Sequence, residues 1–241
     1  MNYVAPWWLP EGNAQTIWAA LRAHRYLGPA PQFFRERWTT PDDDFVDVDW
    51  LQPPKPLAPA ARQPPLLVLF HGLEGSSASH YSQAFADVAT RRGWACAVPH
   101  FRGCSGELNL APRAYHSGDF AEIDWILRRF ASRHTGPAVA VGISLGGNAL
   151  LRWAGEMGAQ SAQVVAAVAA VCAPLDLTAS GRAIGQGFNR QVYTRMFLKS
   201  MVPKALKKLA QHPALFNRNT LLAARDLHAF DDVFTAPLHG F

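Results

Sequence analysis

"AVAVGISLGGNALLRW" (residues 138–153) is the stretch that decides the fold. A run of small apolar residues ends at Gly142, a lone serine stands between Gly142 and Gly146, and a helical pattern follows. Glycines at these places let the backbone turn sharply from strand to helix, which lifts a serine hydroxyl clear of the sheet. The pattern therefore predicts Ser144 as a nucleophile, with the Leu145 amide at the helix start facing a developing oxyanion. The alternative is an ordinary tight turn.

A second loop points to the same chemistry. The apolar run "LLVLF" (66–70) leads into "FHGLEGS" (70–76). A loop after an early strand supplies the other oxyanion donor in enzymes with a Gly-x-Ser-x-Gly turn. We expect the Leu73 amide to be that donor. The alternative is a loop whose glycine serves the turn alone.

The rest of the chain alternates strand and helix patterns. Continuous apolar runs predict strands buried on both faces, at 66–70, 94–99, 138–143 and 164–174. Helical spacing fills the segments between them, which implies a mostly parallel α/β sheet with helices on both faces. "FRERWTT" (34–40) and "FVDVDW" (45–50) alternate with period two and predict a hairpin around "PDDD". Residues 51–65 are proline-rich and predict a surface loop.

Composition excludes several classes of protein. The 241 residues are 49% hydrophobic with a net charge of +5, and no nucleic-acid-binding motif is present. The three cysteines have no metal-site spacing and suit a reducing compartment. No run reaches membrane-spanning length, and the apolar N-terminus lacks the pattern of a signal peptide. We expect a cytoplasmic protein that needs no metal or organic cofactor and binds no nucleic acid.

Residues 177–225 interrupt the alternation. They are helical in character, contain no Asp or Glu, and carry nine basic residues: Arg182, Arg190, Arg195, Lys199, Lys204, Lys207, Lys208, Arg218 and Arg225. A basic amphipathic element can make weak contact with an anionic membrane surface or attract anionic substrates. The alternative, which we favour, is a lid whose apolar side covers a pocket and whose charges face water. We divide the chain into an arm and core (1–176) and a basic helical cap (177–241).

With these motifs in view, the sequence resembles the YheT-like α/β-hydrolases. The motifs that carry the resemblance span the chain: "GNAQTIWAAL", "DFVDVDW", "FHGLEGSSASHY", "PHFRGCSGE", "YHSGD", "GISLGGNALLRW", "APLDL" and "FDDVFTAPLHGF". The resemblance implies an α/β-hydrolase fold with a helical cap after the sixth strand. It also implies hydrolysis of carboxylic esters, either of short- or medium-chain acyl groups or of acylglycerols. Ser144 matches the family nucleophile, and Leu73 and Leu145 match the oxyanion positions.

The other two members of a catalytic triad are not identified. In this fold an Asp or Glu and then a His follow the serine on later strands, and we find no further buried strand after residue 174. We therefore expect a chain cut short at its C-terminus, lacking the final strands, with an unpaired sheet edge that favours self-association. A catalytically impaired fragment that keeps an acyl-binding or lipid-binding surface is the alternative function. Late substitutes for the missing groups are less favoured: Asp226, His228, Asp231, Asp232 and His239.

Overall fold

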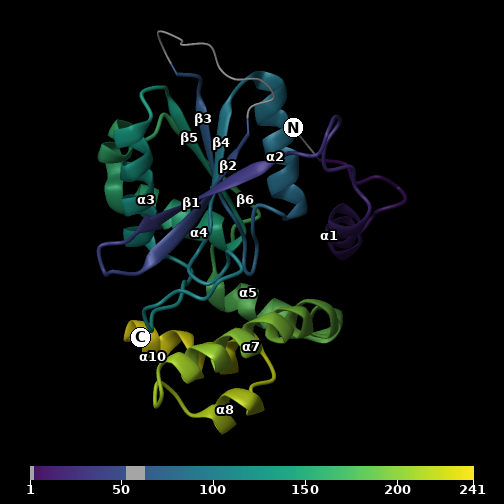
Figure 1. Ribbon diagram of the computed structural model, residues 1–241. Helices are drawn as coiled ribbons and strands as arrows, with labels where there is room; N and C mark the ends of the chain where they lie inside the picture. Colours follow the sequence, from purple (N-terminus) through teal and green to yellow (C-terminus); the bar gives the residue numbers. More distant parts are fainter. Residues whose placement is uncertain (1–2, 53–62) are drawn as a thin grey trace.

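A six-stranded sheet lies at the centre of the computed structural model, which describes residues 3–52 and 63–241 (Figure 1). The strand order is β1-β2-β4-β3-β5-β6. The predicted hairpin is present as β1 (Phe33–Thr39) and β2 (Phe45–Leu51), and β2 pairs antiparallel with β4 (Ala95–Pro99). The remaining pairs are parallel and involve β3 (Leu66–Phe70), β5 (Ala138–Ile143) and β6 (Ala167–Val171). Most of the proline-rich stretch predicted as a loop, residues 53–62, lies outside the described residues.

Helices cover both faces of the sheet. One face carries α2 (His80–Arg92); the other carries α3 (Phe120–Arg133) and α4 (Leu145–Met157) (Figure 1). Successive residues of a strand point to opposite faces, so β3 contributes to two hydrophobic cores. Leu66, Val68 and Phe70 pack with α3 and α4, whereas Leu67 and Leu69 pack with α2. This double burial explains why the parallel strands read as unbroken apolar runs, and the predicted mostly parallel α/β sheet is confirmed.

The residues after β6 form a layer of helices beyond the carboxyl ends of the parallel strands (Figure 1). We call residues 177–241 the cap. It consists of α5 (Leu177–Ile184), α6 (Gly187–Asn189), a π-helical turn η2 (Arg190–Thr194), α7 (Arg195–Gln211), α8 (Arg218–Ala223), α9 (Leu227–Val233) and α10 (Thr235–His239). Its own hydrophobic cluster includes Ala205, Leu221 and Phe230. The cap is therefore a packed unit placed over the end of the sheet where ligands bind in open α/β folds.

Two further helices lie outside the sheet layers and the cap. α1 (Gly12–Leu21) belongs to the N-terminal arm and buries none of its residues, and the 3₁₀ helix η1 (Gly158–Gln163) joins α4 to β6. Within residues 3–52 and 63–241, no helix combines the length and the apolar character needed to cross a bilayer.

β6 differs from the buried strand predicted at 164–174. It is shorter, and its residues alternate between exposed and half-buried. Val168 packs on the core beneath α3 and α4, so Ala167, Ala169 and Val171 point to the opposite face. There they remain exposed, and an apolar groove of about 320 Å³ runs between Ala167 and Ala169 of β6, Val139 and α2. The apolar run at 164–174 does contain the predicted strand, but one face of that strand is uncovered in the described part of the chain.

This uncovered strand generates a prediction about association. β6 is an edge strand without a charge or a proline, and such edges recruit further strands. The chain should therefore self-associate, and Ala169→Lys should shift it toward the monomer because a charge on the uncovered face opposes pairing. Light scattering coupled to size-exclusion chromatography measures the change. Leu151→Lys on the outer side of α4 is the control and should not alter the mass. A monodisperse wild-type monomer would contradict the prediction.

Candidate active site

Ser144 occupies a strained turn between β5 and α4. Its backbone has φ 52° and ψ −116°, a region that residues with side chains rarely enter. Its amide donates to the Val171 carbonyl (2.9 Å), and its carbonyl accepts from the Asn148 amide (3.0 Å). The turn is thus fixed from both sides, by β6 and by the first turn of α4. Strained residues held this firmly concentrate at functional sites.

The two flanking glycines are required by close backbone contacts. A Cβ added to Gly142 would lie 2.5 Å from the Gly146 carbonyl oxygen. A Cβ on Gly146 would lie 2.5 Å from the carbonyl oxygen of His71 and 2.6 Å from that of Phe70. The first turn of α4 therefore rests directly on the ends of β3 and β5, and this contact permits the sharp bend at Ser144.

The loop after β3 reaches the serine. A Cβ on Gly72 would be 3.3 Å from the Ser144 Cβ, so the two backbones are in contact. Tyrosine hydroxyls bind the amides on either side of Leu73: Tyr81 accepts from the Gly72 amide and Tyr115 from the Glu74 amide, both at 3.0 Å. Leu73, Leu145 and Ser144 line one cavity. The structure thus brings together the residues that the sequence selected for nucleophile and oxyanion roles.

That cavity lies between the core and the cap and has a volume of about 870 Å³. Much of its lining is apolar and includes Phe197 and Met201 of α7 and Phe230 of α9. Lys204 reaches the loop after β3: its ammonium lies 2.9 Å from a Glu74 carboxylate oxygen, which also accepts from the Tyr115 hydroxyl at 2.9 Å. The cap is therefore joined to the loop beside Ser144 by an ion pair.

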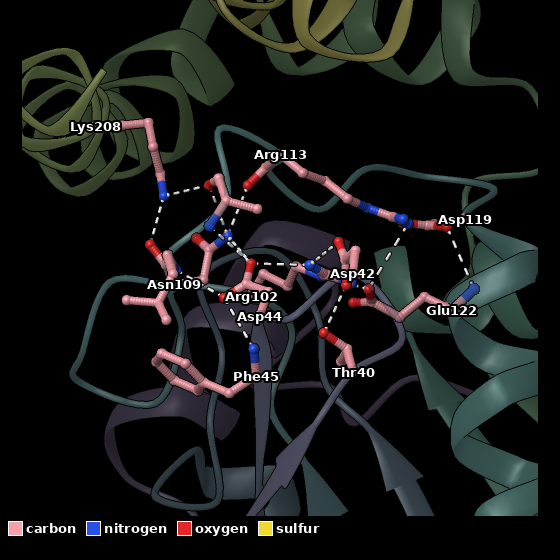
Figure 2. A network of polar contacts seen from close by, with 12 residues as sticks. Thr40, Asp42, Asp44, Phe45, Arg102, Asn109, Arg113, Asp119, Glu122 and Lys208 are labelled. Atoms are coloured by element: carbon pink, nitrogen blue, oxygen red, sulfur yellow. Dashed lines mark hydrogen bonds and ion pairs between the residues drawn. The ribbon is translucent and has the colours of Figure 1, made fainter.

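A second, buried network seats the cap on the core (Figure 2). Arg102, in the loop after β4, binds Asp42, Asp44 and Glu122 at 2.6–2.8 Å. Asp44 also accepts bonds from the Asn109 side chain and the Leu110 amide, which holds the loop that underlies the cap. Lys208 of α7 donates to the carbonyl oxygens of Asn109 (2.6 Å) and Ala111 (2.8 Å). The network thus connects the predicted hairpin turn, two core loops and the cap.

Burial and pairing shift the pKa values of the charged side chains in this network. Burial raises the pKa of Asp42, but the hydrogen bonds from Arg102 and Thr40 and the positive charge of Arg102 together outweigh it and lower that pKa to about 2. Burial lowers the pKa of Lys208 to about 8. Lys208 is 1% exposed, so the expectation that the charges of the basic segment face water is wrong for this residue. The sequence did not reveal this network, because its only local signals are the "PDDD" turn and one lysine among nine basic residues.

The core histidines are engaged in other bonds. His71 accepts from the Phe101 amide through Nε2 (3.1 Å) and contacts the Gly72 carbonyl through Nδ1 (2.8 Å). His100 lies 2.9 Å from Asp49, and His116 contacts the Ser117 carbonyl through Nδ1 (2.6 Å). These bonds order the loops at the carboxyl ends of β3 and β4. In the part of the chain that the structure describes, no histidine hydrogen-bonds to the Ser144 hydroxyl.

The late acidic and histidine residues are spread over α9 and α10. His228 pairs with Asp232 at 2.9 Å on the cap surface, where the two side chains are 86% and 63% exposed. Asp226 caps α9 by accepting from the Ala229 amide, and Asp231 accepts from the Thr235 hydroxyl. The His239 ring packs on His116 with centroids 4.3 Å apart. Their hydrogen bonds are to neighbouring residues of the cap, and Asp226, His228 and Asp231 also line the Ser144 cavity. Across the described ranges, no acidic, histidine and cysteine side chains cluster as a metal site.

Known proteins are similar to this chain in sequence. Residues 65–231 match the family described as alpha/beta hydrolase fold. The chain belongs to that family. It is 42% identical to YheT, a putative esterase of Escherichia coli (strain K12), over 210 residues, which are 86% of this chain and 59% of YheT. The predicted resemblance to YheT-like α/β-hydrolases is thereby confirmed.

More distant relatives align over the same region. The chain is 26% identical to mouse phospholipase ABHD3 over 247 residues, covering 100% of this chain and 58% of ABHD3. The chain thus spans less than two thirds of the length of these curated relatives. Among solved structures, an esterase from Pyrococcus furiosus, Pf2001, superposes with a TM-score of 0.51 at 15% identity, covering 75% of this chain and 66% of the esterase. That likeness concerns the fold.

The close backbone packing predicts a contrast between two glycines of α4. Gly146→Ala should destabilise the fold by roughly 1–3 kcal/mol or more, because its Cβ meets backbone that cannot move aside. Gly155→Ala has nothing within 4 Å of the new Cβ and should stabilise by up to about 1 kcal/mol through helix propensity. Urea unfolding measures both changes. Equal effects at the two positions would contradict the packing argument.

The buried His71 predicts a pH dependence of stability. Burial lowers its pKa to about 3, whereas the unfolded side chain has its ordinary pKa of about 6.5. As the pH falls below about 6.5, the unfolded chain binds a proton that the folded chain does not, so stability present above that pH is lost toward pH 3. His71 should account for about 2 kcal/mol of lost unfolding free energy between pH 7 and about pH 5.

Urea titrations at the two pH values test this dependence with two variants. His71→Asn should remove that part of the loss, whereas His24→Asn, at an exposed position in the arm, should leave it unchanged. The same pH response in His71→Asn and the wild type would contradict the assignment.

Proposed function

We propose that this protein hydrolyses carboxylic esters of short- or medium-chain acyl groups through an acyl-Ser144 intermediate. The observation that carries the proposal is the strained Ser144 at the end of β5, opening on an apolar-lined cavity of about 870 Å³. Relatives named as a phospholipase, in mouse, and as a medium-chain fatty acid ethyl ester synthase/esterase, in yeast, support ester chemistry in this family.

The proposed reaction has two steps. The Ser144 oxygen attacks the ester carbonyl and passes its proton to a general base; the carbonyl oxygen becomes an oxyanion, which accepts bonds from the Leu73 and Leu145 amides. Collapse of this intermediate breaks the bond to the alcohol, which leaves with the proton. Water then attacks the acyl-serine, which releases the carboxylic acid and restores the hydroxyl. A helix N-terminus stabilises the negative charge in both steps.

The lining of the cavity favours a neutral, apolar acyl group. Three of its basic side chains already have partners: Lys204 binds Glu74, Arg102 binds three carboxylates, and Lys208 binds two carbonyl oxygens. Pairing leaves these cations little attraction for an anionic ligand. Aromatic and aliphatic side chains of the cap are then available to contact the acyl chain, as in most small-molecule sites.

A second function, acyl binding without turnover, is favoured by one observation. No described histidine hydrogen-bonds to the Ser144 hydroxyl, because His71, His100 and His116 bind elsewhere. A serine without a base is a weak nucleophile. Under this alternative the cavity binds fatty acids or esters but releases no product.

A fluorophosphonate probe distinguishes the two functions. The ester-hydrolase proposal predicts labelling at Ser144 and faster release of p-nitrophenol from butyrate and octanoate esters than from palmitate. Ser144→Ala should lower both signals by at least about a thousandfold, whereas His24→Ala, at an exposed position in the arm outside the cavity lining, should leave them unchanged. Undiminished hydrolysis by Ser144→Ala would refute the proposal. Fatty-acid binding without labelling would establish the alternative.

A further inference from the structure

The N-terminal arm, residues 3–27, carries a dense group of exposed apolar side chains. Trp7 is 91% exposed, and α1 has no buried residue. The large apolar side chains in the arm that remain exposed are Tyr3, Val4, Trp7, Trp8, Trp18, Leu21, Tyr26 and Leu27. Large contiguous apolar surfaces are uncommon on soluble monomers and mark sites of interaction.

The arm is an ordered element. The Trp8 and Trp18 rings pack edge to face with centroids 5.1 Å apart. The Gln15 side chain donates to the Leu9 carbonyl (2.8 Å) and accepts from the Tyr3 hydroxyl (2.9 Å). These contacts fold the first residues back onto α1. The arm therefore presents its remaining aromatic and aliphatic side chains in a fixed arrangement, with little conformational entropy to lose on binding.

The arm is joined to the basic part of the cap. The Tyr193 hydroxyl of η2 donates to the Asn13 side chain of α1 at 2.9 Å. Arg190 and Met196 stand three residues on either side of Tyr193, and both are exposed. In Figure 1, α1 lies beside the end of the cap that begins α7. The apolar arm and the cap therefore form one continuous surface.

This composite surface, residues 3–27 and 187–199, is basic. It has five cationic residues, Arg22, Arg25, Arg190, Arg195 and Lys199, all exposed, and its only acidic residue is Glu11. Tryptophan and tyrosine side chains with arginines around them match the headgroup region of a bilayer, where ring and guanidinium contact lipid and phosphate together. The cores of protein interfaces, by contrast, are depleted of charge.

We propose that this composite surface binds anionic lipid bilayers, with the aromatic side chains of the arm at headgroup depth and the arginines on lipid phosphates. The site is separate from the Ser144 cavity: of residues 3–27 and 187–199, Phe197 alone lines that cavity, and none of the five cationic residues does. The basic residues of the cap therefore contribute to membrane binding together with the arm. The apolar inner face of the cap still covers the Ser144 cavity. This inference is independent of the proposed ester hydrolysis.

Flotation of the 241-residue chain with vesicles of phosphatidylcholine, alone or mixed with phosphatidylglycerol, tests the proposal. Binding should be about tenfold or more stronger to the anionic vesicles and should weaken with added salt. Trp7→Ser/Leu21→Ser should lower binding by about tenfold through lost apolar contact, and Arg190→Gln/Arg195→Gln should lower it by a similar factor. Brominated phosphatidylcholine in the vesicles should quench tryptophan fluorescence of the wild type.

Two control variants show whether the composite surface itself carries the binding. Leu110→Ser removes an exposed leucine near the far end of α7, next to His212, and should not alter flotation. Ser144→Ala should also float like the wild type, so that failure of the ester-hydrolase proposal leaves this result intact. Equal recovery with neutral and anionic vesicles would overturn the inference. So would arm variants that float normally but lose self-association, because the surface would then bind protein.

Discussion

The contact between the first turn of α4 and the ends of β3 and β5 is the constraint on which the site depends. Gly142 and Gly146 have no room for a side chain because carbonyl oxygens lie 2.5 Å from the added Cβ positions. This packing forces the chain to turn within one residue, and that residue is Ser144, at φ 52°. The same packing brings Gly72 against the serine. The strained turn at Ser144, its place at the N-terminus of α4 and the approach of the loop after β3 are thus consequences of one close backbone contact.

Two polar networks then build the cavity around this turn. Lys204 and Glu74 join α7 to the loop after β3, while Lys208 and the carboxylates that bind Arg102 anchor α7 to the loops beneath it. Removing one charged side chain from such a buried network costs more unfolding free energy than the intact network contributes, because the charge that remains is buried without a partner. The networks therefore fix where the cap lies, and the apolar side of the cap becomes a wall of the cavity.

Much of the fold could be predicted from the sequence, because each strand or helix has a pattern within its own residues. A strand buried on both faces is an unbroken apolar run, so 66–70 and 138–143 coincide with β3 and β5. The cap network could not be predicted, because its partners, such as Asp44 and Arg102, are far apart in the chain. The exposed alternation of β6 was also missed, since an apolar run does not reveal which neighbouring element covers it.

A crystal structure of the chain that resolves the backbone around residue 144 tests the central claim most directly. The account predicts a positive φ at Ser144, its hydroxyl open to the cavity, and the Leu73 and Leu145 amides converging on one point about 3 Å away. A serine in ordinary helical or extended backbone, with its hydroxyl turned toward the sheet, would contradict it. Either amide bonded to a backbone carbonyl would do the same.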